Sequence, residues 1–188
     1  MRQVRYNVAT SLDGYIADAS GGFSWIPEDP AVDFAAIFAR VDTILIGRRS
    51  FETAHKGGAP PWGPGMRVYV FSRSLRPEAH PGVTVVGENS AGRVAALREE
   101  PGGGDIWLFG GGRLFSSLLG DGQVDRVEAT IVPVLLGGGV PLAAPGAPLT
   151  GLRLLDTHRY PSGMVTLTYA VERVAAHPVA ATAGTRDW

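Results

Sequence analysis

Three short clusters of glycine, hydroxyl and arginine residues are the first candidates for chemistry in this sequence. They are Gly47-Arg48-Arg49-Ser50, Ser72-Arg73-Ser74 and Gly110-Gly111-Gly112-Arg113. Guanidinium groups, hydroxyls and the backbone N–H groups that glycine leaves accessible are the groups that bind phosphates in proteins. Each cluster follows an apolar run typical of a buried strand, "DTILI", "RVYVF" or "IWLF". Together the clusters indicate a polyanionic ligand, provided that the fold brings them to one place.

The run of three glycines, Gly110 to Gly112, allows two interpretations. Glycine costs about 0.5–1 kcal/mol relative to alanine inside regular structure, so three in a row must serve the backbone geometry. Either they only make a tight turn from a strand into a helix, or they let the backbone approach a phosphate. The same question applies to a second run, 137–139, which could be no more than a loop.

Hydrophobic periodicity predicts the elements that position these clusters. The expected strands are 3–10, 42–47, 67–72, 83–87, 106–109 and 124–132. The expected helices are 31–40 opened by Pro30, one from Arg48, 90–100 with Ser90 as N-cap, and one after the three glycines. Asp13-Gly14 favours a tight turn, and 152–173 reads as a β-hairpin that turns at Pro161-Ser162-Gly163.

The alternation of strands and helices predicts one α/β domain. We expect a mostly parallel central sheet flanked by helices on both faces, with the C-terminal hairpin as an antiparallel edge. The expected domain covers residues 1–173, and residues 174–188 are expected to form a flexible C-terminal tail. Ligands of such sheets bind at the carboxyl ends of the parallel strands, which is where the three clusters fall.

Composition excludes several classes of protein. The chain has 188 residues and a net charge of −1, so it carries no electrostatic sign of a nucleic-acid or membrane partner. It has no cysteine, which excludes disulfides and thiolate chemistry, and its four histidines show no metal-ligand spacing. No segment approaches the ~20 apolar residues of a membrane span, and no signal peptide is recognisable, so a cytoplasmic location is expected.

Four motifs in order, "VATSLDGYIA", "ILIGRRSFE", "VFSRSL" and "LFGGGRLFSSLL", resemble the dihydrofolate reductase-like superfamily. The resemblance covers roughly residues 3 to 172. "SLDGYIA" and "VPVLLGGGVPL" are most similar to the C-terminal reductase domain of the bifunctional deaminase-reductase of riboflavin biosynthesis and to its stand-alone relatives. The resemblance implies a dihydrofolate reductase-like fold, an NADPH-dependent reductase and a small-molecule substrate.

The resemblance also implies roles for single residues in cofactor binding. The helix that follows Gly47 would face the cofactor phosphates, and the segment at Arg73 would hold the adenosine 2′-phosphate, so that NADPH is preferred to NADH. Ala9 would meet the carboxamide of the nicotinamide, Ile16 would lie under its ring, and the loop 12–25 would be a mobile lid. The implied cofactor-binding residues are Ala9, Ile16, Gly47, Arg48, Arg49, Ser50, Ser72, Arg73, Ser74, Phe109, Gly110, Gly111, Gly112, Arg113 and Leu114.

On the substrate side, the resemblance points to Asp33 and Thr130 as catalytic residues. A carboxylate in the first turn of a helix also stabilises the helix dipole, so Asp33 has a structural interpretation as well. The expected substrate is a small heterocyclic or ribityl-type compound of the kind found in the riboflavin pathway. Two alternatives stay open, a dihydrofolate or pterin reductase and a non-catalytic nucleotide-binding protein. A two-fold homodimer through the C-terminal strands is also expected.

Overall fold

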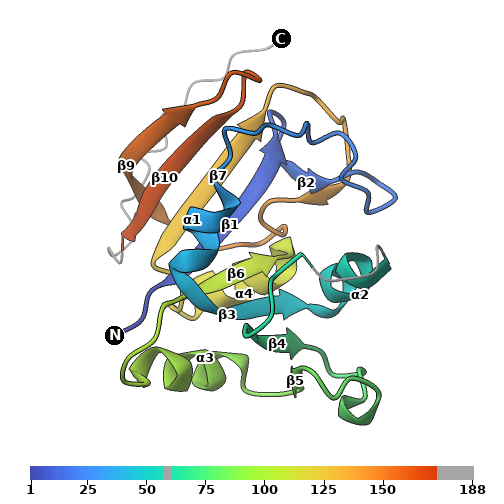
Figure 1. Cartoon of the computed structure of the whole chain (residues 1–188), viewed down its shortest axis with the longest axis vertical. Coiled ribbons are helices and arrows are strands. Elements are labelled where there is room, and N and C mark those ends of the chain that lie inside the picture. The colour runs from blue at the N-terminus through green and yellow to red at the C-terminus, as the bar shows by residue number, and fades with distance from the viewer. Residues whose placement is uncertain (57–60, 173–188) are drawn as a thin grey trace, which may run out of the picture.

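The fold is organised around one central sheet (Figure 1). The computed structural model describes residues 1–56 and 61–172. The sheet has eight strands in the order β5-β4-β3-β6-β1-β7-β10-β9. Their bounds are β1 (Val4–Ser11), β3 (Val41–Gly47), β4 (Arg67–Phe71), β5 (Thr84–Val86), β6 (Asp105–Gly110), β7 (Arg126–Val132), β9 (Gly151–Arg159) and β10 (Val165–Glu172). From β5 to β7 the neighbours run parallel, and β10 and β9 are antiparallel. The predicted sheet with its antiparallel hairpin is confirmed.

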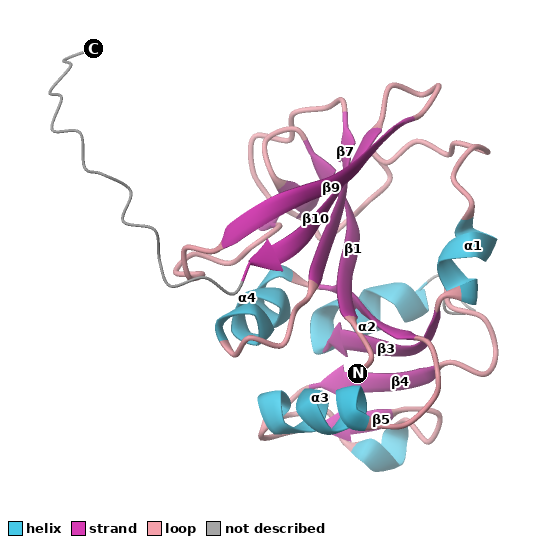
Figure 2. Cartoon of the chain, turned by 90° about the vertical axis from the view of Figure 1, so that its left-hand side faces the viewer, coloured by secondary structure: helices cyan, strands magenta, loops and turns pink. Residues whose placement is uncertain are grey.

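Helices cover both faces of the sheet. The helices are α1 (Phe34–Ala39), α2 (Arg48–Lys56), α3 (Ser90–Glu99) and α4 (Gly112–Gly120), with a short 3-10 turn η1 (Pro77–Ala79). Buried residues of α3 and α4, such as Leu97 and Phe115, share one core with Leu45 of β3. Phe51 of α2 shares the other core with Ile44 and Ile46, because successive residues of a strand point to opposite faces. Figure 2 shows α1 and α4 on opposite sides of β1.

Three details of the predicted elements were wrong. Helix α1 begins at Phe34 rather than at residue 31, because the Asp29 carboxylate accepts a hydrogen bond from the Ala31 amide and holds a separate turn there. Asn89, not Ser90, caps α3, and its side chain accepts from the Gly92 amide at 3.1 Å. Strand β7 begins at 126 instead of 124. The predicted tail, 174–188, lies outside the described residues.

A buried arginine fastens the N-terminus to the sheet. The Arg2 side chain is 4% exposed, forms ion pairs with Asp42 and with Glu100 (3.1 Å), and donates to the Gly104 carbonyl at 2.7 Å. Partial burial opposes the charge on Asp42, but hydrogen bonds from Thr43 and Gly104 and the attraction of Arg2 hold its pKa below the usual value. This cluster joins the start of β1 to β3 and to the end of α3.

Replacing Arg2 by methionine should lower the free energy of unfolding by about 1–3 kcal/mol, because the Gly104 and Leu97 carbonyls lose a buried donor. Asp42 and Glu100 keep Arg67 as an ion-pair partner. Arg153→Met is the control, since Arg153 is 63% exposed and lies 3.8 Å from Glu172; it should cost less than about 1 kcal/mol. Urea unfolding followed by circular dichroism measures both. Equal losses in the two variants would contradict the importance given to the Arg2 cluster.

Candidate active site

The three phosphate-type clusters meet at one edge of the sheet. Gly47 at the end of β3 pairs with Phe71 of β4, and Ile46 pairs with Gly110 of β6. The residues that follow these three strand ends are therefore neighbours in space, although they are far apart in the sequence. The sequence-based expectation that the clusters share one place is confirmed.

The first and second clusters are in direct contact. Arg48, at the start of α2, donates to the Ser74 hydroxyl at 3.0 Å. The Ser72 hydroxyl oxygen accepts from the amides of Ser74 (3.2 Å) and Leu75 (2.9 Å), so it fixes the turn that follows β4. Arg48 and Arg73 are both exposed. This leaves guanidinium groups facing solvent beside an ordered turn.

Gly111 and Gly112 of the third cluster have different surroundings, which would tolerate a side chain to different extents. A Cβ atom on Gly112 would lie 2.2 Å from the Pro141 carbonyl oxygen and 3.1 Å from that of Leu142, so no larger residue fits there. A Cβ on Gly111 would meet only the Ser50 hydroxyl, at 3.2 Å. Gly112 thus serves the close packing of two backbone segments. Gly111 instead lies beside the N-terminal turn of α2, with room for a ligand to approach.

Helix α4 is supported from beneath by Tyr6. Its ring stacks on Phe115 with centroids 3.9 Å apart, and its hydroxyl donates to the Leu142 carbonyl at 2.9 Å. Burial raises the pKa of the Tyr6 hydroxyl, so it stays a donor at neutral pH. This bond fixes the same backbone segment that meets Gly112.

Asp13 joins two motifs that lie 124 residues apart. Its carboxylate accepts from the Ser11 hydroxyl at 2.6 Å and from the amides of Gly137 (2.7 Å) and Leu136 (3.1 Å). These bonds, the one from Ser11 above all, lower the pKa of the Asp13 carboxyl. The predicted Asp13-Gly14 turn is confirmed, but the sequence analysis missed this clamp, because no local pattern shows where a carboxylate finds distant amides.

The two glycine-containing loops are further joined by a two-stranded sheet. Strand β2 (Tyr15–Ala17) pairs with β8 (Val140–Pro141) in antiparallel fashion. Gly139 has φ +145°, and a Cβ there would lie 2.1 Å from the Ala17 carbonyl oxygen. The second glycine run therefore does more than form a loop, since one of its glycines permits close backbone contact with the segment of the predicted lid.

One face of the sheet carries the predicted nicotinamide contact, Ala9, and the predicted substrate residue, Thr130. Ala9 of β1 lies opposite Thr130 of β7, and Asn7 lies opposite Glu128 on the same face. We call this surface, with Thr166 of β10 beside Thr130, the substrate face. The Glu128 carboxylate accepts from Arg5 at 2.5 Å and from Asn7 at 2.9 Å. A small cavity of about 20 Å³ lies between this face and α1, lined by Arg5, Asn7, Ile37, Arg40, Val41, Trp107 and Glu128.

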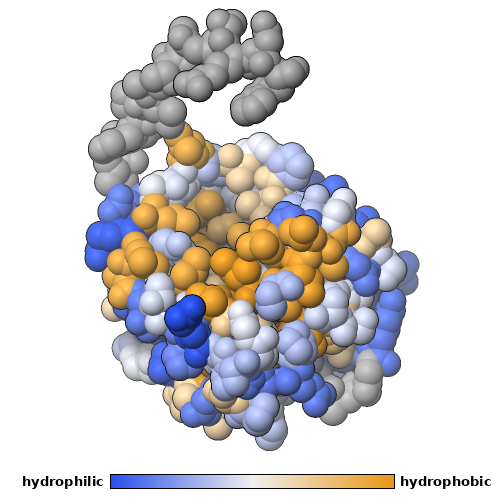
Figure 3. All heavy atoms as spheres, turned by 90° about the horizontal axis from the view of Figure 1, so that it is seen from above, coloured by the Kyte–Doolittle hydropathy of each residue, from blue (hydrophilic) through white to orange (hydrophobic). Residues whose placement is uncertain are grey.

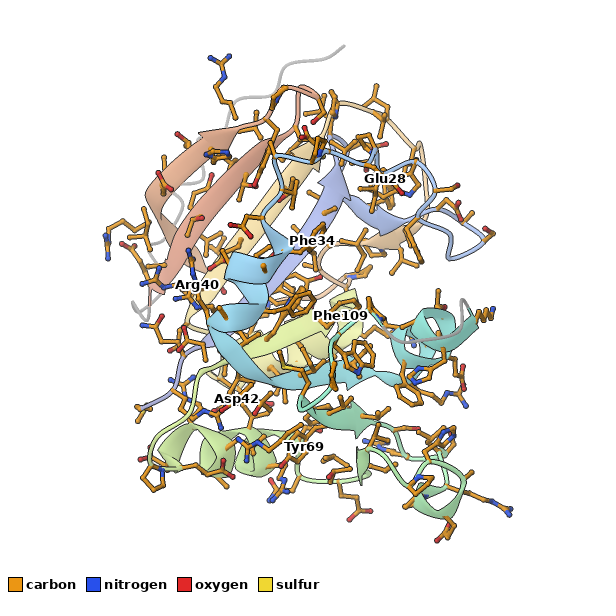
Figure 4. The ribbon with its side chains drawn as sticks, in the orientation of Figure 1. Glu28, Phe34, Arg40, Asp42, Tyr69 and Phe109 are labelled. Atoms are coloured by element: carbon orange, nitrogen blue, oxygen red, sulfur yellow. The ribbon has the colours of Figure 1, made fainter. Side chains whose placement is uncertain are left out.

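The other predicted residues lie on β2, α2 and α4 and at the start of α1. Asp33 is exposed and caps α1 by accepting from the Ala36 amide at 2.8 Å, which is the structural role that its position also allowed. Its catalytic role stays a prediction. Figure 4 shows Phe34 at the start of α1 and Phe109 between α1 and α2. Ala9, Ile16, Ser50 and Leu114 are half-buried, whereas Arg49 and Arg113 are exposed.

Apolar surface surrounds a hollow at the end of the molecule where the loops after β1 and β7 lie (Figure 3). Leu12 follows β1, Phe23 follows β2, Leu135 follows β7 and Val140 lies in β8. These side chains are 64%, 57%, 72% and 38% exposed. No group of three metal-ligating side chains occurs among the residues described, and no helix within them is long and apolar enough to cross a bilayer. The site thus combines exposed cationic and hydroxyl groups with an apolar rim.

The chain is similar to a known protein family and to proteins of known sequence and structure. The family model described as "RibD C-terminal domain" matches residues 2–166. A protein of Bacillus subtilis (strain 168), "Uncharacterized protein YyaP", is 31% identical over 187 residues, covering 89% of this chain and 94% of that one.

Solved structures share the fold. A protein from Shewanella sp. PV-4 named for riboflavin biosynthesis superposes with a TM-score of 0.78 at 26% identity, over 92% of this chain and all of that one. A second similar structure is the diaminohydroxyphosphoribosylaminopyrimidine deaminase/5-amino-6-(5-phosphoribosylamino)uracil reductase of Thermotoga maritima. It superposes with a TM-score of 0.65 at 19% identity, over 90% of this chain and 56% of that one. A dihydrofolate reductase from Enterococcus faecalis, complexed with NADP(H), superposes with a TM-score of 0.62 at 18% identity, over 90% of this chain and 96% of that one.

The two glycines should respond differently to alanine. Gly112→Ala should lower the free energy of unfolding by more than about 2 kcal/mol, because its Cβ would collide with the backbone of 141–142. Gly111→Ala should change it by less than about 1 kcal/mol, since the Ser50 hydroxyl can rotate away. Thermal and urea unfolding measure the difference. A Gly112→Ala protein as stable as the Gly111→Ala protein would show that the two segments are not held in close contact.

Proposed function

Because the chain belongs to the RibD C-terminal domain family, we propose that it is an NADPH-dependent reductase that transfers a hydride to a small heterocyclic or ribityl-type acceptor. The family and the dihydrofolate reductase-like neighbours support a reductase-type enzyme of the riboflavin-pathway kind. The observation that carries the choice of cofactor is the convergence of the three phosphate-type clusters at the ends of β3, β4 and β6.

The residues at this edge fit a dinucleotide phosphate chemically. The N-terminal turn of α2 offers backbone N–H groups and the Ser50 hydroxyl beside Gly111, where the backbone leaves room for a pyrophosphate. The exposed Arg73, on the turn ordered by Ser72, would pair with a 2′-phosphate, for which a guanidinium offers several donors in a fixed fork. Bound NADPH would supply the hydride, and these side chains would hold its phosphates.

The other end of the site would hold the nicotinamide and keep water away from it. The Asp13 clamp fixes the loop after β1 beside the loop after β7, and both loops carry exposed apolar side chains. An apolar enclosure excludes solvent, which protects a hydride from competing reactions. Ala9 and Ile16 are placed at this end by β1 and β2, and we propose them as the contacts of the nicotinamide.

The acceptor would lie on the substrate face, next to Ala9. Thr130, Asn7 and Glu128 give this face polar groups that can orient a nitrogen heterocycle through its edge. We propose Thr130 as a substrate contact. Asp33 is proposed as a second one, approaching from the start of α1, where its other carboxylate oxygen can serve the acceptor while one oxygen caps the helix.

We also propose that two copies of the chain pair through β9. All nine residues of this edge strand are exposed, and Leu152, Leu154 and Leu155 expose 44%, 51% and 39% of their surface. An unpaired edge with apolar side chains favours association, and a strand can pair with its own copy in antiparallel fashion about a two-fold axis. Nine residues span about 30 Å, so the pairing of two copies of β9 would continue the sheet along this whole edge.

The choice of NADPH is tested at Arg73. Arg73→Ala should weaken NADPH binding by about ten- to a hundredfold and leave NADH binding little changed, because one charge-assisted contact contributes about 1.5–3 kcal/mol. Arg76→Ala is the control, since Arg76 is also exposed and lies three residues further on. Fluorescence titration of the nicotinamide gives both affinities. Equal losses for the two cofactors would remove Arg73 from the 2′-phosphate site.

The acceptor is tested by the loss of nicotinamide absorbance with 5-amino-6-(5-phosphoribosylamino)uracil and, separately, with dihydrofolate. Oxidation of NADPH by the first compound and little by the second is the expected result. Robust dihydrofolate turnover would favour a folate reductase. NADPH binding without turnover of either compound would favour a non-catalytic nucleotide-binding protein.

The assembly is tested by sedimentation velocity. The wild type should sediment as a dimer, and Leu154→Lys should sediment as a monomer, because a charge cannot be buried cheaply in an apolar contact. Leu12→Lys, at an exposed leucine outside β9, should remain dimeric. A monomeric wild type, or a dimer that survives the Leu154→Lys change, would refute pairing through β9.

A further inference from the structure

Three hydroxyl groups form a continuous row on the substrate face. The Thr130 and Thr166 hydroxyls lie 2.7 Å apart, and the Thr166 hydroxyl donates to that of Tyr160 at 3.4 Å. Thr130 lies directly opposite Ala9, so the row begins beside the proposed nicotinamide contact. It then crosses from β7 to β10 and ends near the hairpin turn. We call these residues the hydroxyl row.

The fold does not depend on these hydroxyl groups. A pair of threonines facing each other across two strands contributes only about 0.2–1 kcal/mol to a sheet. Valine has the same shape and an equally good strand propensity, so an apolar pair would serve the sheet as well. Each hydroxyl carries one donor and two acceptor sites. The two bonds within the row therefore leave donor and acceptor capacity for a further partner.

The charged groups next to the row are paired. Arg5 is shared by two carboxylates, Glu128 at 2.5 Å and Asp105 at 2.6 Å. Arg40 lines the same small cavity as Arg5 and Glu128, so two guanidinium groups and two carboxylates lie together there. Glu128 is two residues from Thr130 along β7. The row therefore offers hydrogen bonds without an unpaired cation beside it, which suits a neutral group with N–H or O–H donors and oxygen acceptors.

Neighbouring segments fix the far end of the row. The Asp29 carboxylate accepts from the Ser162 amide at 3.1 Å, which ties the segment before α1 to the hairpin turn. The His158 ring packs edge-on against Tyr160, with ring centroids 4.6 Å apart. The hydrogen bond from Ser162 to Asp29 therefore holds the hairpin turn beside the segment before α1, at the end of the row where Tyr160 lies.

We propose that the hydroxyl row binds the neutral polar edge of the acceptor, and that Thr166 and Tyr160 are specificity-determining residues together with Thr130. The inference rests on the proposed reductase function, whose acceptor must lie next to Ala9. Two parts of a 5-amino-6-(5-phosphoribosylamino)uracil-like acceptor carry this chemistry, the imide edge of the ring and the sugar hydroxyls. Each of these two parts offers hydrogen-bond donors together with acceptors, as the hydroxyl groups of the row do.

The test measures binding without turnover. Protein saturated with NADP⁺, which holds no hydride to transfer, is titrated calorimetrically with 5-amino-6-(5-phosphoribosylamino)uracil and with 5,6-diaminouracil, the same ring without the sugar. Thr166→Val and Tyr160→Phe should each weaken binding of the first compound about tenfold and leave NADP⁺ binding unchanged. Thr168→Val is the control, since Thr168 lies on the same strand and face, opposite Glu128. It should stay within about twofold of the wild type.

The second compound shows which part of the acceptor is bound. If the row binds the ring, both variants lose affinity for both compounds; if it binds the sugar, only the first compound is affected. Unchanged affinities in both variants, or a wild type that binds neither compound, would overturn the inference. Selective loss of binding in a protein that never oxidises NADPH would support the row while refuting the reductase. Normal oxidation of NADPH together with unchanged acceptor binding in both variants would support the reductase and overturn the hydroxyl row.

Discussion

The close contact of the backbone at 139–142 with its surroundings is the constraint on which the site depends. Gly139 lies against the Ala17 carbonyl, Gly112 against that of Pro141, and the Tyr6 hydroxyl holds the Leu142 carbonyl. One segment therefore sets the distance between the loop after β1 and the start of α4. In the proposed function these are the nicotinamide end and the pyrophosphate end of one cofactor, so a rigid link between them matters more than any single ligand contact.

The Asp13 carboxylate completes this link through hydrogen bonds, whereas the glycines contribute through close backbone packing. The hydrogen bond from the Ser11 hydroxyl, and then those from the amides of Leu136 and Gly137, stabilise the charged carboxylate of Asp13 and lower its pKa. The motif "SLDGYIA" is thus physically joined to "VPVLLGGGVPL". The contact holds the two segments together in the fold.

In the proposed function, two regions that differ in charge bind the cofactor phosphates and the acceptor. The ends of β3, β4 and β6 carry guanidinium groups, hydroxyls and glycines, which suit phosphates. The substrate face carries Glu128, an arginine shared between two carboxylates, and hydroxyl groups, which suit a neutral polar heterocycle. A dinucleotide and an uncharged ring edge could therefore bind side by side without competing for the same partners.

The sequence by itself predicted the eight strands of the central sheet, its mostly parallel arrangement and the three clusters after β3, β4 and β6, because hydrophobic periodicity and strand-end chemistry are local properties. It did not predict the short strands β2 and β8, which pair with each other. It failed where the deciding contact was distant or subtle. Asp29 holds a turn that delays α1, and Asn89 replaces Ser90 as a cap. Only the tertiary structure decided that Asp13 is a clamp and that Thr166 and Tyr160 join Thr130, since hydrogen bonds between residues far apart in sequence follow from how strands pair and leave no pattern in the chain.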